Sequence, residues 1–341
     1  MKLLLLEPEA VASGRGNATT AARYAAAATA AGWTVLRGTP TQHSVERVDL
    51  IHAHHAMRCG PSALRLARQQ NCPLVVSLGG TDLHGQDASG LDPLARAPLQ
   101  QATRIVGPFA EDAALLQAAG IDTAHYRVVR RGVAVATPSS HTVSQVGLRL
   151  LSLGALRPLK NTMAAIEIAT ALRAAGMRCT LHIVGAALNE QYATQVRARL
   201  GQNALQHASQ DALQNAVEPG ALPALFADTD LLLNTSLAEG ASNALLEALG
   251  AGVPVAASSV HGNVALLRNA PAQVACLFDL ASPLAALLPF VHSLEQATQE
   301  SWTTRALCAR RFVQQHHATA DEARELLQVW NEALSAPPCR Q

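Results

Sequence analysis

The sequence predicts an α/β protein made of two doubly wound parallel-sheet domains of the Rossmann type. Short apolar runs, typical of buried parallel strands, alternate with longer stretches rich in alanine and leucine, which favour helices. Each half of the chain begins with a strand, a glycine-containing loop and a helix, over residues 2–31 and 148–175. A chain of 341 residues is long enough for two domains with ample cores.

The first half alternates strands and helices up to a polar linker. Its first strand, helix and second strand, residues 2–36, form a β-α-β unit whose right-handed crossover makes the sheet parallel. Further strands are expected at residues 49–53, 73–78, 104–107 and 126–129. Residues 137–145 are rich in Ser, Thr and Pro and indicate a linker. We therefore expect domains at residues 1–145 and 146–310, followed by a C-terminal segment, residues 311–341.

The composition limits the classes of function. The net charge is +1, so nothing indicates a nucleic-acid or acidic-membrane partner. The apolar run at the N-terminus is too short for a signal peptide, and no run of roughly 20 apolar residues predicts a transmembrane segment. The six cysteines show no CxxC or zinc spacing, which favours free thiols in a reducing compartment. These features predict a cytoplasmic protein.

Residues 230–257 carry the clearest signal for a binding site. A buried strand leads into a loop and then into a helix that begins after Ser242, its expected N-cap. Gly250 or Gly252 is expected to end this helix before a second strand. The free N–H groups of residues 240–243, together with the helix dipole, would attract a phosphate at the carboxyl end of a parallel strand.

Two acidic residues accompany that anion site. Glu239 lies just before the helix, and Glu247 lies a little over one turn inside it. Their carboxylates would repel a phosphate unless they face other groups, such as the hydroxyls of a sugar or a ribose. Two acids eight residues apart are also common on a solvated face, but the adjoining strand and glycines favour a nucleotide-sugar pocket.

The second domain begins with a similar loop that contains two cations. Gly154 follows the strand at residues 148–153, and Arg157 and Lys160 precede the next helix. Arginine can hold two phosphate oxygens at once, whereas lysine acts as a point charge. Cations at a helix N-terminus oppose the helix dipole, so an anionic ligand explains them better than a solvated helix start.

Polar residues also follow strands of the first domain. Gly16 and Asn17 begin the first helix, where a backbone without side chains can approach a phosphate, although tight turns use the same residues. In the segment GGTD, Gly80 permits close approach of a ligand, and Thr81 and Asp82 supply a hydroxyl and a carboxylate. Asp82 is equally consistent with a helix cap.

Three histidines, His52, His54 and His55, lie at the end of one expected strand. Alternation along the strand puts His52 and His54 on one face and His55 on the other, so the three cannot converge on a metal ion. A histidine at the carboxyl end of a strand can serve as a proton acceptor or hydrogen-bond donor for a substrate. His54 or His55 is therefore an acceptor-side candidate, and a hydrogen-bonded core or surface histidine is the alternative.

The segment EGASNALLE, residues 239–247, resembles the E-x7-E motif of the retaining glycosyltransferases of family 4, and GAGVPVAAS resembles the strand that follows it. That family has the GT-B fold, in which two Rossmann-like domains face a cleft and the last helix, here residues 321–335, packs back on the first domain. The segments GGTD, LRPLK and VHGNVALL resemble a subgroup that contains the glycosyltransferase 1 domain-containing proteins and the selenosugar synthases. Gly79 and Ala155 depart from the family pattern, which usually has a histidine and an arginine there.

The resemblance and the residue patterns together give roles for the site residues. Glu239 would orient the donor sugar and Glu247 the ribose, while Lys160 and Arg157 would stabilise the departing diphosphate. The expected catalytic residues are Glu239, Lys160, Arg157 and Asp82. The expected donor-binding residues are Gly16, Asn17, Gly154, Gly240, Ala241, Ser242, Asn243 and Glu247. The acceptor-side candidates are His54, Gly80 and Thr81.

These roles predict a retaining glycosyltransferase that moves a sugar from a nucleotide diphosphate, such as UDP-N-acetylglucosamine, to a small-molecule acceptor. No cofactor is expected, and no metal, because no paired acids of the DxD type are found in the expected place. One alternative is a selenosugar synthase, which couples UDP-N-acetylglucosamine to selenophosphate in selenoneine biosynthesis. Another alternative is a nucleotide-sugar-binding protein without turnover. The departures from the family pattern at Gly79 and Ala155 would be consistent with this alternative.

Overall fold

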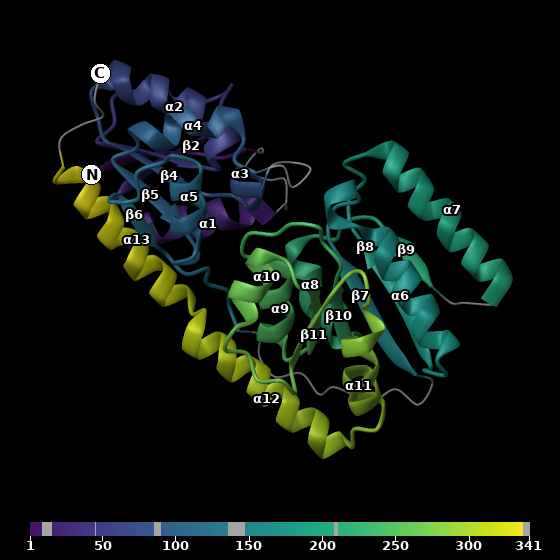
Figure 1. Cartoon of the computed structure of the whole chain (residues 1–341). Coiled ribbons are helices and arrows are strands. Elements are labelled where there is room, and N and C mark those ends of the chain that lie inside the picture. Colours follow the sequence, from purple (N-terminus) through teal and green to yellow (C-terminus); the bar gives the residue numbers. More distant parts are fainter. Residues whose placement is uncertain (9–15, 45, 85–89, 136–146, 208–210, 337–341) are drawn as a thin grey trace. The chain divides into compact units, whose positions relative to one another are not determined.

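The computed structural model describes residues 1–8, 16–44, 46–84, 90–135, 147–207 and 211–336 (Figure 1). The chain divides into two compact units. Unit 1 comprises Met1–Gly132 and His317–Gln341, and unit 2 comprises Val133–His316. The expected linker, residues 137–145, lies outside the described residues. Each unit is an α/β domain with its own sheet.

Unit 1 contains a six-stranded parallel sheet in the order β2-β1-β3-β4-β5-β6. Its strands are β1 (Lys2–Leu6), β2 (Thr34–Gly38), β3 (Leu50–His54), β4 (Leu74–Ser77), β5 (Arg104–Gly107) and β6 (Tyr126–Val128). Its helices are α1 (Gly16–Ala30), α2 (Ala56–Gln70), α3 (Gly80–His84), α4 (Pro93–Gln101), α5 (Asp112–Ala118) and α13 (Thr319–Leu334). The strand order reverses beside β1, which pairs with β2 on one side and with β3 on the other.

Helices cover both faces of this sheet because alternate residues of each strand point to opposite sides. Leu3 and Leu5 of β1 pack in one cluster with Tyr24 of α1 and Trp330 of α13. The intervening residues Leu4 and Leu6 join a second cluster with apolar residues of α2 and α4. The last helix of the chain, α13, is thus part of the core of unit 1.

Unit 2 contains a second six-stranded parallel sheet in the order β12-β11-β10-β7-β8-β9. Its strands are β7 (Leu148–Leu153), β8 (Cys179–Val184), β9 (Ala212–Gln214), β10 (Leu231–Asn234), β11 (Val255–Ser258) and β12 (Ala275–Phe278). Its helical elements are η1 (Pro158–Lys160), α6 (Thr162–Ala174), α7 (Glu190–His207), η2 (Pro219–Ala221), α8 (Leu222–Ala227), α9 (Asn243–Ala251), α10 (His261–Leu267), α11 (Leu284–Glu295) and α12 (Gln299–His316).

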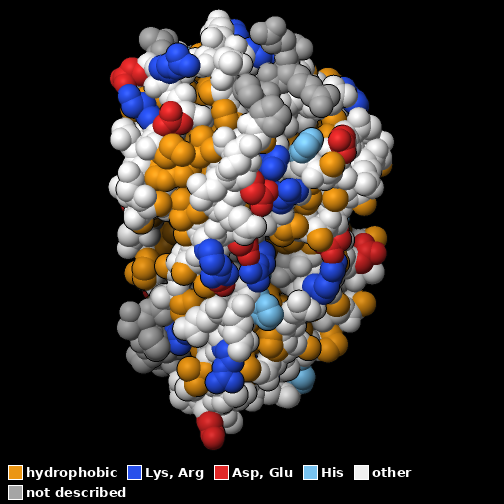
Figure 2. All heavy atoms as spheres, turned by 90° about the vertical axis from the view of Figure 1, so that its left-hand side faces the viewer, with side chains coloured by type: hydrophobic (Ala, Val, Ile, Leu, Met, Phe, Trp, Pro, Cys, Tyr) orange, Lys and Arg blue, Asp and Glu red, His pale blue; other side chains and the backbone are white. Residues whose placement is uncertain are grey.

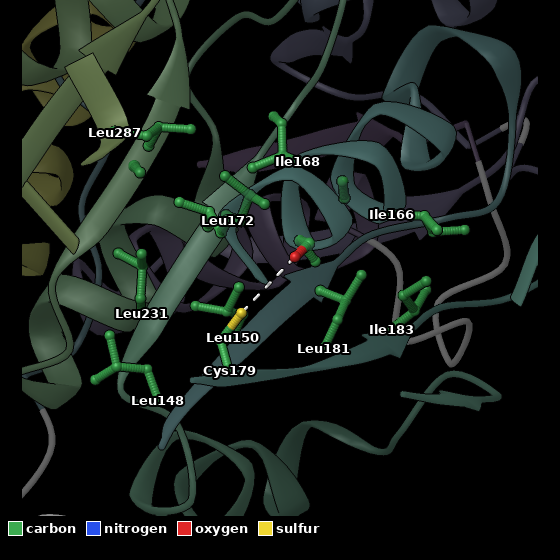
Figure 3. Packing of buried hydrophobic residues seen from close by; sticks show 14 of the residues in the cluster. Leu148, Leu150, Ile166, Ile168, Leu172, Cys179, Leu181, Ile183, Leu231 and Leu287 are labelled. Atoms are coloured by element: carbon green, nitrogen blue, oxygen red, sulfur yellow. Dashed lines mark hydrogen bonds between the residues drawn. The ribbon is translucent and has the colours of Figure 1, made fainter. Parts of the chain in front are cut away.

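The core of unit 2 lies between the sheet and helices α6, α7 and α11. Leu150 of β7 and Leu181 of β8 face Leu172 of α6 and Leu287 of α11 (Figure 3). Burying one such leucine side chain is worth about 1.5–3 kcal/mol. Two doubly wound parallel sheets therefore confirm the predicted fold class.

The sequence prediction for unit 2 lacked four of its helices and strands: α7, β9, α11 and β12. Helix α7 is mostly polar, and its buried side chains are few; among them are Tyr192, Val196 and Leu200. The edge strand β9 is three residues long and partly exposed, so it has no apolar run. Elements at the margin of a sheet bury too little surface to give the periodic patterns on which the prediction depends.

The face drawn in Figure 2 carries charges of both signs next to one another. On α13, Glu332 pairs with Arg104 and Arg127 of the same unit, and Glu325 pairs with Arg130. This mixture agrees with the net charge of +1. Within the described part of the chain, we find no helix with the length and apolar character needed to cross a bilayer.

Candidate functional site

The candidate site of unit 2 lies where its strand order reverses. Strand β7 is the first strand of this sheet along the chain, and it pairs with β8 on one side and β10 on the other. The loops that follow β7 and β10 therefore diverge at one edge of the sheet, which is the usual place for ligands in open α/β sheets. The first loop carries Lys160, and the second carries Glu239.

Lys160 and Glu239 form an ion pair. The ammonium Nζ of Lys160 lies 2.5 Å from Oε1 of Glu239. The Glu239 side chain is 9% exposed and that of Lys160 is 24% exposed, so the ammonium group keeps access to solvent. The structure thus brings together two of the residues predicted to act on a donor, one from each loop.

Lys160 is also unusual in the composition of the chain. Among the 26 lysine and arginine residues, only Lys2 and Lys160 are lysines. Lysine is a compact charge on a flexible stem, whereas arginine presents a planar fork. This scarcity is a sequence signal that marks position 160 independently of any motif.

Polar neighbours fix the carboxylate of Glu239. Its Oε1 accepts hydrogen bonds from Ser236 Oγ at 2.7 Å and from Asn234 Nδ2 at 3.1 Å. Burial opposes the charged form, but the Lys160 ammonium and the hydrogen bonds from Lys160, Ser236 and Asn234 outweigh it and lower the pKa of Glu239. Glu239 is therefore a carboxylate at neutral pH, able to accept hydrogen bonds from hydroxyl groups.

Backbone contacts hold the two loops together. The N–H of Leu237 donates to the carbonyl of Leu159 at 2.9 Å, and Thr235 Oγ1 donates to the carbonyl of Asn161 at 2.9 Å. Asn161 adopts a left-handed backbone conformation, φ 48°, which ends η1 just after Lys160. These contacts keep Lys160 close to Glu239.

Helix α9 begins beside this pair. Ser242 occupies its N-cap position, as predicted, but its side chain makes no capping hydrogen bond. Its hydroxyl instead lies 3.5 Å from Asn234 Nδ2 as an acceptor. The predicted N-cap position is therefore confirmed, and the N-terminal N–H groups of α9 receive no hydrogen bond from the Ser242 side chain. Gly252, at φ 91°, ends the helix.

A second layer of residues supports the Glu239 loop. Gly262 in α10 lies so close to this loop that a Cβ atom there would be 2.1 Å from the carbonyl oxygen of Gly240. The buried Asn263 donates to Asn234 Oδ1 and to the carbonyl of Ser258. One sequence signal for this layer is a polar residue, Asn234, at the end of an apolar strand.

The other predicted residues of unit 2 lie on the same two loops and on α9. Gly154 faces the stem of Lys160, since a Cβ atom there would lie 3.8 Å from Lys160 Cδ. Arg157 is half-buried at the start of η1, and Glu247 is half-buried within α9. Gly240, Ala241 and Asn243 complete the loop and the first turn of α9.

The predicted residues of unit 1 form a separate group. Gly16 and Asn17 begin α1, and Gly80 and Thr81 begin α3. Asp82 is fully buried, and its carboxylate accepts hydrogen bonds from the backbone N–H groups of Ala56 and Met57, both at 2.9 Å. Both oxygens of Asp82 thus cap the N-terminus of α2, which is a structural role, and its catalytic role stays a prediction.

The two histidines of β3, His52 and His54, lie on the same face of the sheet, as expected from strand alternation. His52 and His54 both pack on Tyr24, with ring centroids 5.3 Å and 5.5 Å away. Burial lowers the pKa of His52 to about 3 and is the main cause that lowers the pKa of His54. His54 is 1% exposed, so it is a core residue and offers no surface to an acceptor. His55 lies on the other side, next to Asp82.

The described residues contain no group of three His, Cys, Asp or Glu side chains arranged to hold a metal ion. The five cysteines in the described part of the chain are free thiols.

The lowered pKa of Glu239 predicts a dependence of stability on pH. A carboxyl group with a folded-state pKa below its unfolded value of about 4.3 stabilises the fold above that value, and the contribution is lost as the pH falls through the folded pKa. We expect the stability difference between the wild type and Glu239→Gln to shrink below about pH 4.3. Urea unfolding between about pH 6 and pH 3 measures it. A difference that stays constant or grows in acid would contradict this assignment.

Family comparisons agree with this division into two domains. Residues 20–137 match the profile of Glycosyltransferase Family 4, and residues 147–288 match that of Glycosyl transferases group 1. A search of curated proteins finds no match.

Three solved structures are similar over nearly the whole chain. Alr3699/HepE from Anabaena, in complex with UDP and glucose, has 16% identity and a TM-score of 0.75, with 97% of this chain and 99% of that chain covered. Sucrose-phosphate synthase from Thermosynechococcus elongatus has 15% identity and a TM-score of 0.79, with 98% and 99% covered. A glycosyltransferase from Rickettsia africae has 15% identity and a TM-score of 0.73, with 98% of each chain covered. The two profile matches and this shared fold identify the chain as a glycosyltransferase with the GT-B fold.

Proposed function

We propose that the protein transfers a sugar from a UDP-sugar to a hydroxyl-bearing small molecule, with retention at the anomeric carbon. The observation that carries this proposal is the contact between Lys160 and Glu239 at the reversal point of the unit 2 sheet. A cation that keeps access to solvent suits a diphosphate, and a fixed carboxylate suits the hydroxyls of a sugar.

The departing diphosphate develops negative charge as the bond to the sugar breaks. Lys160, Arg157 and the N–H groups at the start of α9 would stabilise that charge, which is electrostatic catalysis by groups already in place. Glu239 would hold the sugar hydroxyls, and Glu247 would bind the ribose. Two of the similar structures support UDP as the nucleotide, since Alr3699/HepE was solved with UDP and glucose and with UDP-glucose.

The identity of the sugar and of the acceptor distinguishes the remaining candidates. UDP-N-acetylglucosamine and UDP-glucose are the first donors to test. An ordinary glycosyltransferase and a selenosugar synthase would share every donor-side residue named above. Comparing an alcohol with selenophosphate as the acceptor separates them, and NMR of the product gives the anomeric configuration.

Lysine labelling offers a direct test of the donor site, because the chain contains only two lysines. We expect UDP to protect Lys160 from an amine-reactive ester, while Lys2 reacts equally with and without UDP. Lys2 is a suitable internal control because it lies in unit 1 and pairs only with the exposed Glu46 among the ion pairs described. Peptide mass spectrometry measures both sites in one sample. Equal labelling of Lys160 with and without saturating UDP would exclude this assignment.

A further inference from the structure

An amide connects the carboxylate of Glu239 to helix α10. Asn234, the last residue of β10, is 8% exposed and lies between Glu239 and Asn263 of α10. Its Nδ2 donates to Oε1 of Glu239 at 3.1 Å, and its Oδ1 accepts from Nδ2 of Asn263 at 3.3 Å. All three residues belong to unit 2, so this row of polar groups is complete within one unit.

The neighbours of Asn234 fix which way its amide points. The backbone N–H of Ser236 can only donate, and it lies 3.2 Å from Oδ1 of Asn234. The carboxylate of Glu239 can only accept, so Nδ2 must face it. Asn263 is fixed in the same way, because its Nδ2 donates to the carbonyl of Ser258 at 3.0 Å as well as to Asn234. Turning over the amide of Asn234 would place donors against donors and acceptors against acceptors.

Every hydrogen bond that the described residues make with the Glu239 carboxylate ends on one oxygen. Oε1 receives Lys160 Nζ at 2.5 Å, Ser236 Oγ at 2.7 Å and Asn234 Nδ2 at 3.1 Å. A carboxylate oxygen offers about two lone pairs, so three donors occupy Oε1 fully. Oε2 is the oxygen that remains for a hydroxyl of a ligand.

We propose that Asn234 is a positioning residue for sugar transfer, which holds Oε1 of Glu239 so that Oε2 meets a hydroxyl of the donor sugar. This inference rests on the proposed function, because Glu239 is the residue given there to the sugar. The terminal torsion of a glutamate side chain is broad, so without the amide the lone pairs of Oε2 point in a less defined direction. Asn234 acts through Glu239 and needs no contact with the substrate.

A neutral donor suits this place better than a second cation. Under the proposed function the diphosphate is the other partner of Lys160, so the hold of Lys160 on Oε1 weakens when the donor binds. Ser236 and Asn234 then remain to hold the carboxylate. The hydroxyl of Ser236 rotates about its C–O bond, whereas the amide of Asn234 is planar and braced by Asn263. Asn234 thus keeps Glu239 oriented toward the sugar while charge moves to the diphosphate.

Replacing Asn234 by aspartate tests this role through the pH dependence of the rate. The substitution keeps the shape of the side chain but exchanges the donating NH2 for an oxygen that faces Glu239. Two carboxylates at this distance raise the apparent pKa of the pair, and Lys160, the cation in contact with Glu239, lowers it. Below that pKa the pair binds one proton, and the protonated carboxyl group donates to its neighbour as the amide does. The contribution of the amide is therefore regained in acid and lost as the pH rises through the pKa of the pair.

At about pH 8 we expect kcat/KM of Asn234→Asp to lie about 100-fold below that of the wild type, the size of loss that small misplacements cause. The ratio of the two values should shrink by roughly tenfold or more as the pH falls to about 5, because the pair then gains its proton. Rates of UDP release from the UDP-sugar that the wild type turns over measure both values. Asn234→Ala should show the loss at every pH, since it has no proton to gain. A ratio for Asn234→Asp that stays constant over this range would overturn the proposal.

Asn203→Asp is the matched control. Asn203 is an asparagine of α7 in the same unit, 1% exposed, and its Nδ2 donates to Thr170 Oγ1 at 2.9 Å. The substitution puts a carboxylate in place of another buried amide, so it should lower the melting temperature and leave the pH dependence of kcat/KM as in the wild type. A purely structural role for Asn234 would give Asn234→Asp this same behaviour.

A swapped pair keeps the test decisive if the two carboxylates of Asn234→Asp prevent folding. In Glu239→Gln the amide of Asn234 still donates, so the new NH2 group takes the place of Oε2 and presents a donor where the sugar hydroxyl needs an acceptor. In the double variant with Asn234→Asp, the NH2 group turns to the aspartate and the carbonyl oxygen faces the sugar. We expect the double variant to be about tenfold faster than Glu239→Gln, the value of one neutral hydrogen bond. A double variant no faster than the single one would overturn the proposal.

The thermal shift caused by UDP separates this inference from the proposed function. Lys160 and the N-terminus of α9 are unchanged in Asn234→Ala, so saturating UDP should raise its melting temperature as it does for the wild type. Wild-type protein that neither binds UDP nor releases it from any UDP-sugar would contradict the proposed function itself. Normal binding of UDP with a wild-type rate in Asn234→Ala would contradict only the role of Asn234.

Discussion

Replacing Lys160 by alanine is expected to lower kcat/KM for sugar transfer by about 10²–10³, which corresponds to about 2.7–4 kcal/mol of lost transition-state stabilisation. The reason is that Lys160 is the cation next to Glu239 with access to solvent, on the loop where the diphosphate should lie. Steady-state rates of UDP release with the preferred donor measure the effect. Lys2→Ala is the matched control, because Lys2 forms an exposed pair with Glu46 and its loss should change the rate little.

The loss of Lys160 also leaves Glu239 buried beside no cation, so instability of unit 2 has to be separated from lost catalysis. The double variant Lys160→Met with Glu239→Gln removes both charges and should regain stability relative to Lys160→Ala. Its rate should nevertheless stay low. Recovery of transfer along with the melting temperature would show that Lys160 acts only through stability, and a wild-type rate in Lys160→Ala would remove it from the site.

Gly185→Ala is expected to destabilise unit 2 by about 3 kcal/mol, at the upper end of the usual cost of overpacking. A Cβ atom at position 185 would lie 1.8 Å from the carbonyl oxygen of Gly154, so the two loops that follow β7 and β8 would have to separate. For a unit of this size, such a loss lowers the melting temperature by about 6–12 °C. Differential scanning calorimetry can resolve the shift.

Gly201→Ala supplies the control for that experiment. Gly201 lies inside α7 in the same unit, and no other atom would come within 4 Å of an added Cβ. Alanine favours the helix by about 0.5–1 kcal/mol at such a place, so this variant should melt slightly higher than the wild type. If Gly185→Ala melts at the wild-type temperature, the close contact with Gly154 is not a constraint on the fold.

The fold could be predicted from the sequence largely because parallel strands are buried on both faces. Short continuous apolar runs such as those of β1 and β10 are typical of strands buried on both faces, and glycine-containing loops mark their carboxyl ends. Lys160 and Glu239 were found for the same reason, since each lies just after such a strand. Helix α7 gave no signal because its apolar contacts are few and its surface is polar.

The contacts around His55 in unit 1 were harder to predict. His55 and Asp82 lie far apart in the sequence, and only the pairing of β3 with β4 shows that they approach one another. Strand alternation correctly placed His54 and His55 on opposite faces, but it could not tell which face the core would cover. The face that is covered depends on Tyr24, which belongs to α1, a helix from elsewhere in the chain.

The contact between Lys160 and Glu239 has a consequence for how the enzyme handles its spent nucleotide. Without ligand, each side chain neutralises the other at 2.5 Å. Free UDP would attract the Lys160 ammonium to its phosphates. The carboxylate of Glu239 would then have neither its cation nor a sugar hydroxyl to bind. Under the proposed function, an intact UDP-sugar would compensate both side chains, so this exchange of partners would favour loading of fresh donor and hasten departure of the product.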